Sequence, residues 1–414
     1  MNDSALESEV RSYSRNWPVV FDRARGSRLT DRDGRARLDF FTGAGALNYG
    51  HNHPVLKRAL LDYLERDGIT HGLDMLTTAK EGFLAEFGAR LLGPRRLDYR
   101  VQFPGPTGTN SVEAALKLAR KVTGRQTVVA FTGAFHGMSL GSLAVTGNAS
   151  KRAGAGVPLD HTWRLPYDGF AGGEVSGLTL LDAMLDDRSS GLDLPAAVIV
   201  ETVQGEGGVN TASPTWLADL AELCERRGVL LIVDDIQMGC GRTGPFFSFE
   251  VAGITPDIVC LSKSLSGYGL PMALTLFRPE LDVWQPGEHN GTFRGNNPAF
   301  VTAAAALREF WADSTLEKQT EVRAGLFEER LSELAGRYPA RVAGWRGRGL
   351  VWGLVFREAA LARRVADTAF ARGLLVETSG SDDEVVKLLP PLTATDAELA
   401  EGLDVLGESV AAVA

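Results

Sequence analysis

The sequence predicts an α/β protein with a large domain, in which a mixed but mostly parallel sheet lies between helices, and a smaller α+β domain. Between about residues 55 and 300, apolar runs of about four to six residues alternate with amphipathic helical stretches. Continuous apolar runs are typical of strands buried on both faces, and intervening helices are typical of parallel crossovers. The remaining residues mix strand-like and helical segments, and a chain of 414 residues suggests more than one domain.

Each element of the large domain follows from a local pattern. The strands expected there are Tyr99–Phe103, Thr127–Phe131, Ala196–Val200, Val229–Val233, Ile258–Leu261 and Met272–Phe277. Amphipathic stretches predict helices at Val112–Val122 and Pro214–Arg227. Upstream, residues 28–41 predict a hairpin, because Asp33-Gly34 favours a tight turn between strands.

The smaller domain is expected after a long helical pattern that begins near Pro298. Its later elements are a strand at Leu350–Phe356, a helix at Ala359–Arg372, a strand at Val385–Leu389 and a helix from about Asp396. The hairpin cannot bury both of its faces alone, so we expect it to join this domain. The predicted division is an N-terminal segment that forms part of the small domain (1–54), a large domain (55–300) and a C-terminal small domain (301–414).

Composition excludes several classes of protein. The chain has 52 acidic and 43 basic residues, a net charge of −9, which gives no basis for general binding to nucleic acid or an anionic membrane. Hydrophobic residues make up 44%, which excludes disorder for most of the chain. The spacing of Cys224, Cys240 and Cys260 fits neither a disulfide framework nor a zinc site, so we expect free thiols and no metal. With no apolar run long enough to span a membrane and no leader-like N-terminus, we expect a cytoplasmic protein.

Two predicted strands end in residues that carry chemistry. The run Val229–Val233 leads directly into Asp234 and Asp235, where a carboxylate at a strand end needs a cationic partner. The run Ile258–Leu261 leads into Lys263, flanked by serines, and burial would make such an amine a nucleophile toward carbonyl groups. Taken singly, the aspartate could also be a helix cap or turn residue, and the lysine a surface residue.

Three further loops carry polar or aromatic groups. Residues 103–110 (FPGPTGTN) precede a helix, and backbone N–H groups there suit a phosphate, although threonine and asparagine are also ordinary helix caps. Phe135 follows another strand and either stacks on a flat ring or fills the core. Residues 289–296 form a polar, glycine-rich stretch. A carboxylate, a nucleophilic lysine, a phosphate cradle and a stacking aromatic together indicate a pyridoxal-phosphate site.

In these motifs the chain resembles the class III aminotransferases, which are pyridoxal-phosphate enzymes of fold type I. The matching motifs, in the family's order, are Thr107-Gly108-Thr109, Phe135-His136-Gly137, residues 201–206 (ETVQGE), residues 234–237 (DDIQ), Ser262-Lys263 and Gly291-Thr292-Phe293. The resemblance covers roughly residues 10–410. It implies that Lys263 forms a Schiff base with the cofactor and moves protons, while Asp234 pairs with the pyridine nitrogen.

The resemblance also implies the remaining cofactor contacts. Gly108 and Thr109 would bind the phosphate, Phe135 would cover one ring face, and His136 belongs to the same motif. Gln237 would hydrogen-bond the phenolic oxygen. Thr292 would reach the phosphate of a neighbouring subunit, which implies a homodimer or a higher homo-oligomer with shared sites.

Longer runs resemble one branch of the family, which uses L-2,4-diaminobutanoate and 2-oxoglutarate in ectoine biosynthesis. These runs are residues 39–51, 70–75, 105–110, 233–241 and 264–271. They imply reversible transfer of the terminal amine, giving L-aspartate 4-semialdehyde and L-glutamate. The alternatives are an ω-aminotransferase for ornithine, 4-aminobutyrate or a siderophore or antibiotic precursor, an aminomutase, or a non-catalytic scaffold.

One position departs from the wider family. Many relatives carry an arginine just before a Pro-Pro-Leu motif, where it pairs with an acidic switch residue and binds the glutamate carboxylate. Here residues 387–392 read KLLPPL, so Lys387 stands at that position and Glu206 at the switch. A lysine is a point charge without the planar fork of arginine, so bidentate recognition is lost.

Overall fold

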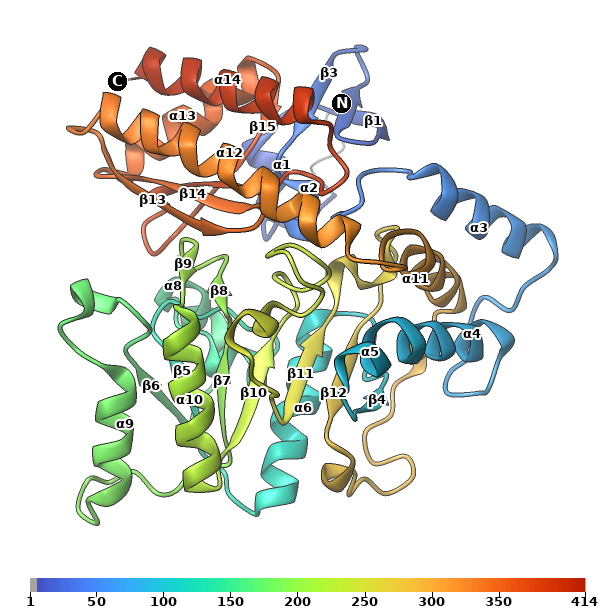
Figure 1. Ribbon diagram of the computed structural model, residues 1–414, viewed down its shortest axis with the longest axis vertical. Coiled ribbons are helices and arrows are strands. Elements are labelled where there is room, and N and C mark those ends of the chain that lie inside the picture. Colours follow the sequence, from blue (N-terminus) through green and yellow to red (C-terminus); the bar gives the residue numbers. More distant parts are fainter. Residues whose placement is uncertain (1–5, 414) are drawn as a thin grey trace.

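The computed structural model describes residues 6–413, arranged as a large α/β part with a smaller part packed on one end (Figure 1). The large part contains a seven-stranded sheet in the order β4-β12-β11-β10-β7-β5-β6. Its strands are β4 (Arg100–Gln102), β5 (Val128–Phe131), β6 (Thr162–Leu165), β7 (Ala197–Val200), β10 (Leu230–Asp234), β11 (Ile258–Leu261) and β12 (Leu274–Phe277).

This sheet is mixed and mostly parallel. β6, β5, β7, β10 and β11 pair in parallel, whereas β12 is antiparallel to both β11 and β4. All four residues of β5, β7 and β11 are buried. Because neither face of these strands meets water, their apolar residues do not alternate with polar ones. The predicted fold class is confirmed.

Alternate residues of the strands enter cores on opposite faces of the sheet. Ala130 and Ile232 pack with α6 (Gly108–Thr123) in one core. Phe131 and Val233 pack with α10 (Pro214–Arg227) in the other. The other helices of this part are α3 (Pro54–Glu65), α4 (Thr78–Phe87), α5 (Gly93–Arg95), α7 (Leu140–Val145), α8 (Ala149–Arg152), α9 (Gly177–Asp186) and α11 (Asn297–Phe310).

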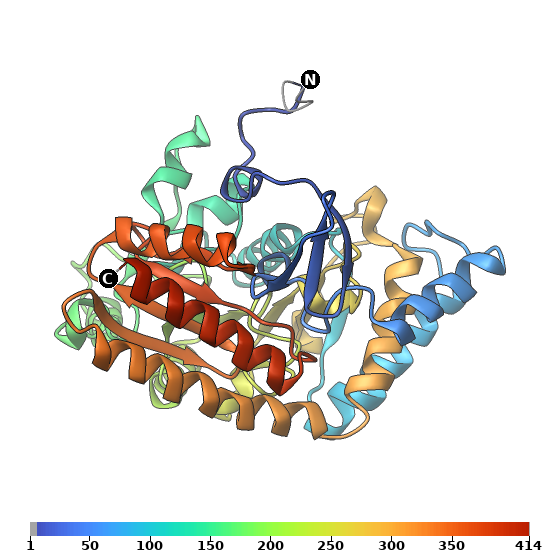
Figure 2. The ribbon, with the colours of Figure 1, turned by 90° about the horizontal axis from the view of Figure 1, so that it is seen from above.

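The smaller part is built from an N-terminal and a C-terminal segment of the chain, and Figure 2 shows the blue N-terminal strands beside the red C-terminal helices. One sheet has the order β1-β2-β3-β15, and β15 comes from the C-terminal region. The second has the order β13-β14-β17-β16. The strands are β1 (Phe21–Arg25), β2 (Arg28–Asp31), β3 (Ala36–Asp39), β13 (Val342–Arg348), β14 (Val351–Phe356), β15 (Leu374–Leu375), β16 (Glu377–Ser379) and β17 (Val385–Leu388). Helices α12 (Thr315–Arg337), α13 (Ala359–Ala371) and α14 (Asp396–Val413) pack against them.

A left-handed turn lies where the two parts meet. The four residues of α2 (Thr42–Gly45) all have positive φ, from 48° to 81°, so this short segment turns opposite to an ordinary helix. Such a conformation costs about 1–2 kcal/mol for each non-glycine residue. The turn directs the carbonyl of Ala44 toward the site described below.

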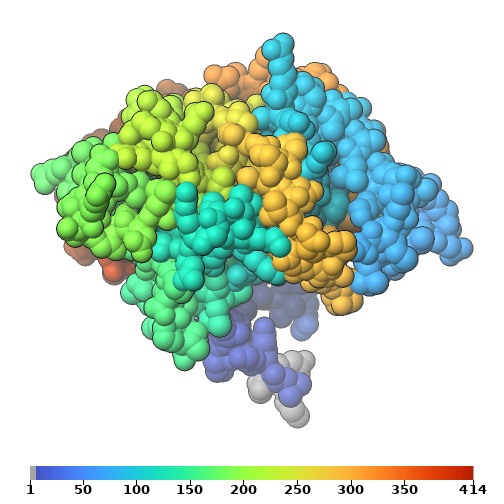
Figure 3. Space-filling view, turned by 90° about the horizontal axis from the view of Figure 1, so that it is seen from below, coloured from blue at the N-terminus to red at the C-terminus, as the bar shows by residue number. Residues whose placement is uncertain are grey.

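The view from below (Figure 3) shows the large part, with the blue region that contains α3 and α4 projecting at one side. Within residues 6–413, no helix combines the length and the apolar character that crossing a membrane requires. The three cysteines are buried and form no disulfide.

Candidate active site

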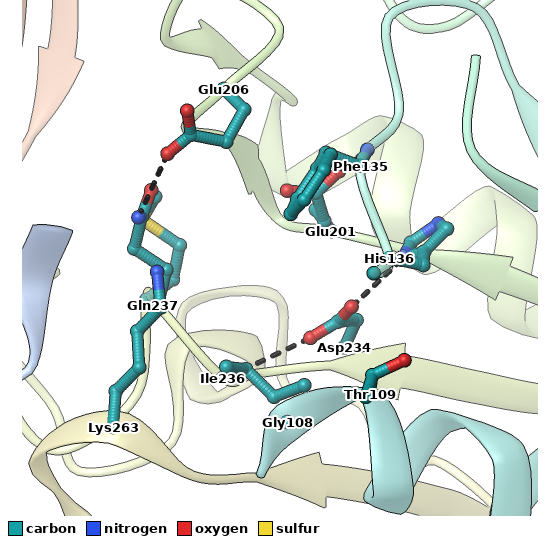
Figure 4. A pocket seen from close by; sticks show the side chains of 12 residues that line it. Gly108, Thr109, Phe135, His136, Glu201, Glu206, Asp234, Ile236, Gln237 and Lys263 are labelled. Atoms are coloured by element: carbon teal, nitrogen blue, oxygen red, sulfur yellow. Dashed lines mark hydrogen bonds and ion pairs between the residues drawn. The ribbon is translucent and has the colours of Figure 1, made fainter. Parts of the chain in front are cut away.

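A pocket lies at the carboxyl ends of the parallel strands, where ligands bind in open α/β sheets (Figure 4). The loops after β5, β7, β10 and β11 supply most of its wall, and the N-terminus of α6 supplies the rest. Its lining residues are Gly108, Thr109, Phe135, His136, Gly137, Glu201, Glu206, Asp234, Ile236, Gln237, Met238 and Lys263. Sequence motifs up to 155 positions apart therefore meet in one place.

Asp234 is the last residue of β10, and its carboxylate points into the pocket (Figure 4). Its Oδ2 lies 2.7 Å from His136 Nδ1, and Oδ1 accepts from the Ile236 N–H at 3.2 Å. Because the carboxylate accepts, His136 Nδ1 carries the proton, and the buried Nε2 has no partner among the described residues. His136 therefore fixes the orientation of Asp234.

The neighbouring Asp235 is oriented away from the pocket. Its carboxylate accepts from the backbone N–H of Ser248 at 3.0 Å and from the Ser248 hydroxyl. Burial raises the pKa of Asp235 to about 7. Only the first of the two successive aspartates can thus face a bound ring.

Lys263 begins a short turn directly after β11, and its φ of 49° lies in the left-handed region. Serines on both sides hold this turn: the Ser262 hydroxyl donates to the Met272 carbonyl, and that of Ser264 donates to the Gly45 carbonyl, each at 2.8 Å. Lys263 Nζ donates to Ala44 O at 2.8 Å. Burial lowers the pKa of Lys263, which increases the fraction of neutral, nucleophilic amine.

The phosphate end of the pocket is the start of α6. Gly108 and Thr109 are the first two residues of this helix, so their N–H groups have no intrahelical acceptor. A Cβ on Gly108 would lie 3.0 Å from the Ile236 side chain, so a side chain there would crowd the site. The Thr109 hydroxyl is tied to Ser139 Oγ at 2.6 Å and to Ser142 Oγ at 2.9 Å.

Phe135 and Ile236 line opposite sides of the pocket in Figure 4. The Phe135 N–H donates to the buried carboxyl of Glu201 at 2.9 Å, which fixes the loop that carries the ring. Burial, followed by the charge of Asp234, raises the pKa of Glu201 well above its usual range. Sequence reasoning assigned no role to Ile236, although its place two residues after Asp234 was available as a signal.

Gln237 and Glu206 form the side of the pocket nearest the sheet that contains β17. Gln237 Nε2 donates to Ala44 O at 2.9 Å and to Glu206 Oε1 at 3.2 Å. Gln237 Oε1 is buried without a partner among the described residues. Burial alone would raise the pKa of Glu206, but the ammonium groups of Lys387 and Lys263 outweigh it and lower this pKa to about 2.

Lys387 lies on β17, behind Glu206, and its side chain is fully buried. Its Nζ donates to Glu206 Oε1 at 2.8 Å and lies 3.0 Å from Oε1 of Glu377, a residue that the sequence motifs do not include. Burial opposes the charge on Lys387, yet the two carboxylates raise its pKa. Lys387 is therefore not a solvent-exposed strand residue.

Thr292 is the one predicted cofactor residue that does not line this pocket. It lies in a short turn, Thr292–Arg294, and its carbonyl is 2.7 Å from His71 Nε2.

Comparison with known proteins identifies the family. The sequence model of the family 'Aminotransferase class-III' matches residues 10–410. The chain belongs to the class III aminotransferases. A diaminobutyrate–2-oxoglutarate transaminase from Streptomyces avermitilis is 66% identical over 98% of this chain and 96% of its own length. One from Vibrio cholerae is 58% identical over 97% of each chain.

Solved structures agree with the fold. The ornithine aminotransferase of Toxoplasma gondii is 28% identical, with a TM-score of 0.86 over 99% of this chain and 94% of its own. The lysine aminotransferase of Mycobacterium tuberculosis is 26% identical, also with a TM-score of 0.86, over 99% and 98%. This aminotransferase is thus a fold type I enzyme.

Its cofactor is pyridoxal 5′-phosphate, and the residues present fit that group. The pocket offers a buried lysine amine, a carboxylate on the opposite side, free helix N-terminal N–H groups and two apolar walls. The unpartnered Gln237 Oε1 also lies at this pocket, as expected where a polar ligand group completes the hydrogen bonding.

Proposed function

We propose that this aminotransferase exchanges the terminal amine of L-2,4-diaminobutanoate with 2-oxoglutarate, reversibly, giving L-aspartate 4-semialdehyde and L-glutamate. The observation that carries the proposal is the 66% identity, over nearly the whole chain, to a transaminase named for these two substrates. The site geometry supports it, since one ammonium, that of Lys387, is buried beside the pocket and paired with a carboxylate that can exchange for a substrate's.

We infer a role for each pocket residue in holding the cofactor. Gly108 and Thr109 donate backbone N–H groups to its phosphate, and Asp234 accepts from its protonated ring nitrogen. Phe135 and Ile236 exclude water from the two ring faces, and Gln237 hydrogen-bonds the phenolic oxygen. When bound, the cofactor supplies an electron-withdrawing ring that stabilises negative charge on the reacting carbon.

Lys263 is proposed to hold the cofactor and then to move the proton. Once the substrate has displaced Lys263 from the cofactor, the Lys263 amine is free beside the reacting carbon. Burial lowers the pKa of this amine, so that a fraction of it is neutral and can act as a base. Asp234 keeps its charge directed at the ring because His136 holds it from behind at 2.7 Å. A fixed charge of this kind needs no reorganisation during the reaction.

Glu206 and Lys387 are proposed to let one pocket accept two substrates. Diaminobutanoate presents its terminal amine, so no carboxylate reaches Lys387, which stays neutralised by Glu206. Glutamate presents its α-amine, so its α-carboxylate lies close to the ring. Glu206 then moves aside, and the carboxylate takes its place beside the ammonium of Lys387.

The decisive experiment is the identity of the product. Reaction of the holoenzyme with diaminobutanoate and 2-oxoglutarate should give aspartate 4-semialdehyde, trapped by an aldehyde reagent, together with glutamate. Formation of 4-amino-2-oxobutanoate would contradict transfer of the terminal amine. Ornithine and 4-aminobutyrate serve as competing donors. A higher kcat/KM for either than for diaminobutanoate would identify that compound as the preferred amino donor.

We further propose that the enzyme is a homodimer or a higher homo-oligomer. Exposed apolar side chains gather after α3 and near Thr292, including Met75, Leu76 and Phe293, which are 56%, 72% and 67% exposed. His71 links the two segments, since its ring packs on Phe293 and its Nε2 contacts the Thr292 carbonyl. A second copy would cover this surface and place Thr292 at its partner's phosphate. Light scattering should give a mass of at least two chains.

The place of the reaction is also a proposal. A cytoplasmic enzyme that supplies diaminobutanoate for ectoine synthesis fits the named relatives. Neighbouring genes for an acetyltransferase and a small cyclising synthase would support this pathway.

A further inference from the structure

Lys387 has a second buried carboxylate beside it, that of Glu377. Glu377 lies on β16, directly opposite Lys387 across the antiparallel pair β16–β17. Its side chain is 4% exposed, and its Oε1 is 3.0 Å from Lys387 Nζ. That oxygen makes no aligned hydrogen bond among the described residues, so the contact is an ion pair.

The two carboxylates differ in their freedom to move. Glu206 lies in a loop with Gly205 on one side and Gly207 on the other, and its side chain is 23% exposed at the pocket. Glu377 lies within a strand whose three residues all pair with β17. Glu206 can therefore turn away when a substrate carboxylate arrives, whereas Glu377 stays beside Lys387.

Charge then decides how well a carboxylate binds at this lysine. The charged or titratable groups around Glu377 are Lys387, Glu206, Lys263 and the Tyr13 hydroxyl. A substrate carboxylate in the place of Glu206 would lie within about 6 Å of Glu377, since both carboxylates contact one ammonium. An ionised Glu377 repels it, and a protonated Glu377 does not.

We propose that Glu377 is a specificity-determining residue: it remains beside Lys387 when Glu206 withdraws, and its ionisation sets the affinity of the site for the substrate carboxylate. The inference rests on the proposed function, in which 2-oxoglutarate places a carboxylate at Lys387. Binding of 2-oxoglutarate is then accompanied by proton uptake at Glu377. Diaminobutanoate, which leaves the Glu206–Lys387 pair closed, binds without that uptake.

The electrostatics agree with this geometry. Burial is the largest influence on Glu377 and raises its pKa, Lys387 opposes that effect, and Glu206 adds to it, for a pKa of about 7. Glu377 therefore changes its ionisation near neutral pH.

Proton uptake can be measured on the wild-type holoenzyme. Its pyridoxal form has no amino group to give, so 2-oxoglutarate binds without reacting. Calorimetric titrations at pH 8 in two buffers of different ionisation enthalpy give the number of protons taken up. We expect a value close to one for 2-oxoglutarate, and zero would overturn the inference.

The variant Glu377→Gln provides a second, independent readout. At pH 8 it should bind 2-oxoglutarate about 10-fold more tightly than the wild type, without proton uptake, and at pH 6 the two should bind alike. The half-reaction with diaminobutanoate should change less than twofold. Glu384→Gln, on the connection between β16 and β17, is the matched control and should behave as the wild type.

The remaining outcomes separate this inference from the proposed function. Weaker 2-oxoglutarate binding by Glu377→Gln at every pH would mean that the residue only supports Lys387, and the inference would be wrong. If the wild type neither binds 2-oxoglutarate nor forms glutamate from it, the proposed function itself fails. Conversion of 2-oxoglutarate with equal affinities in both proteins at pH 8 would reject the role of Glu377 alone.

Discussion

Replacing Lys387 with methionine should damage one half of the reaction far more than the other. Methionine keeps most of the volume of this fully buried side chain but removes the ammonium that contacts Glu206 and Glu377 at 2.8 and 3.0 Å. 2-Oxoglutarate then loses the cation that we propose for its carboxylate. Diaminobutanoate does not use this cation, so its half-reaction should be largely preserved.

The size of the effect follows from the contact that is lost. A hydrogen bond to a charged group contributes about 1.5–3 kcal/mol, which corresponds to about a 10- to 150-fold loss in kcat/KM for 2-oxoglutarate. The upper part of this range is expected, because Glu377 remains and repels the substrate carboxylate at neutral and alkaline pH. Acidification to pH 6 should recover part of the loss, since Glu377 and Glu206 then take up protons.

Single-turnover spectroscopy measures the two half-reactions separately. The pyridoxal form is mixed with diaminobutanoate, and the pyridoxamine form with 2-oxoglutarate. Lys121→Met is the matched control, because this lysine also pairs with a glutamate, Glu288, at 2.6 Å but lies on the surface away from the pocket. Equal damage to both half-reactions in Lys387→Met, or none in either, would refute the proposed exchange.

Three further outcomes test the cofactor residues and the ion pair. Lys263→Ala should lose the borohydride-reducible bond to the cofactor, detected by mass spectrometry of peptides, and a reducible bond at another lysine would show that the assignment is wrong. Asp234→Asn should retain cofactor yet lose about 100-fold or more in rate, whereas Asp235→Asn should mainly lower the melting temperature; the reverse ranking would contradict the orientation of the two side chains. The wild type should lose stability as the pH falls from about 4.5 toward 2, because the pKa of Glu206 is lower in the folded protein than in the unfolded chain. Thermal melts of Lys387→Met should not show this loss.

Much of the fold was predictable because the buried strands carry their signal in their own residues. Runs such as Ala196–Val200 are apolar on both faces, and the structure places strands within them. The edge strand β6 (Thr162–Leu165) was missed, since it includes Thr162 and Arg164 and is only partly buried. Its identity as a strand depends on pairing with β5, which no local pattern reveals.

The pocket was predictable for a different reason. Its residues follow strand ends, and the carboxyl ends of parallel strands meet at one edge. Glu377 was missed because only the pairing of β16 with β17 places it opposite Lys387. A single glutamate in a short strand belongs to no motif that the sequence could reveal. The left-handed turn at Ala44 was missed as well, because Thr42 and Ala44 share the positive φ of Gly43 and Gly45, and these two residue types do not signal it.

The stability of Glu377→Gln separates a structural role of this residue from a functional one. The pKa of Glu377 is raised from 4.5 to about 7 in the folded protein, so its contribution to stability is fully present below about pH 4.5 and is lost as the pH rises through 7. The loss corresponds to about 3 kcal/mol above pH 7.

Glu377→Gln should therefore melt a few degrees higher than the wild type at pH 8.5 and at the same temperature at pH 5. Thermal melts of the two apoproteins, each at both pH values, measure this difference directly. A variant that melts lower at pH 8.5 would mean that the ionised carboxylate stabilises the fold, and packing alone would then explain its presence. A variant that melts higher leaves the control of carboxylate binding as the reason for an ionisable group at this position.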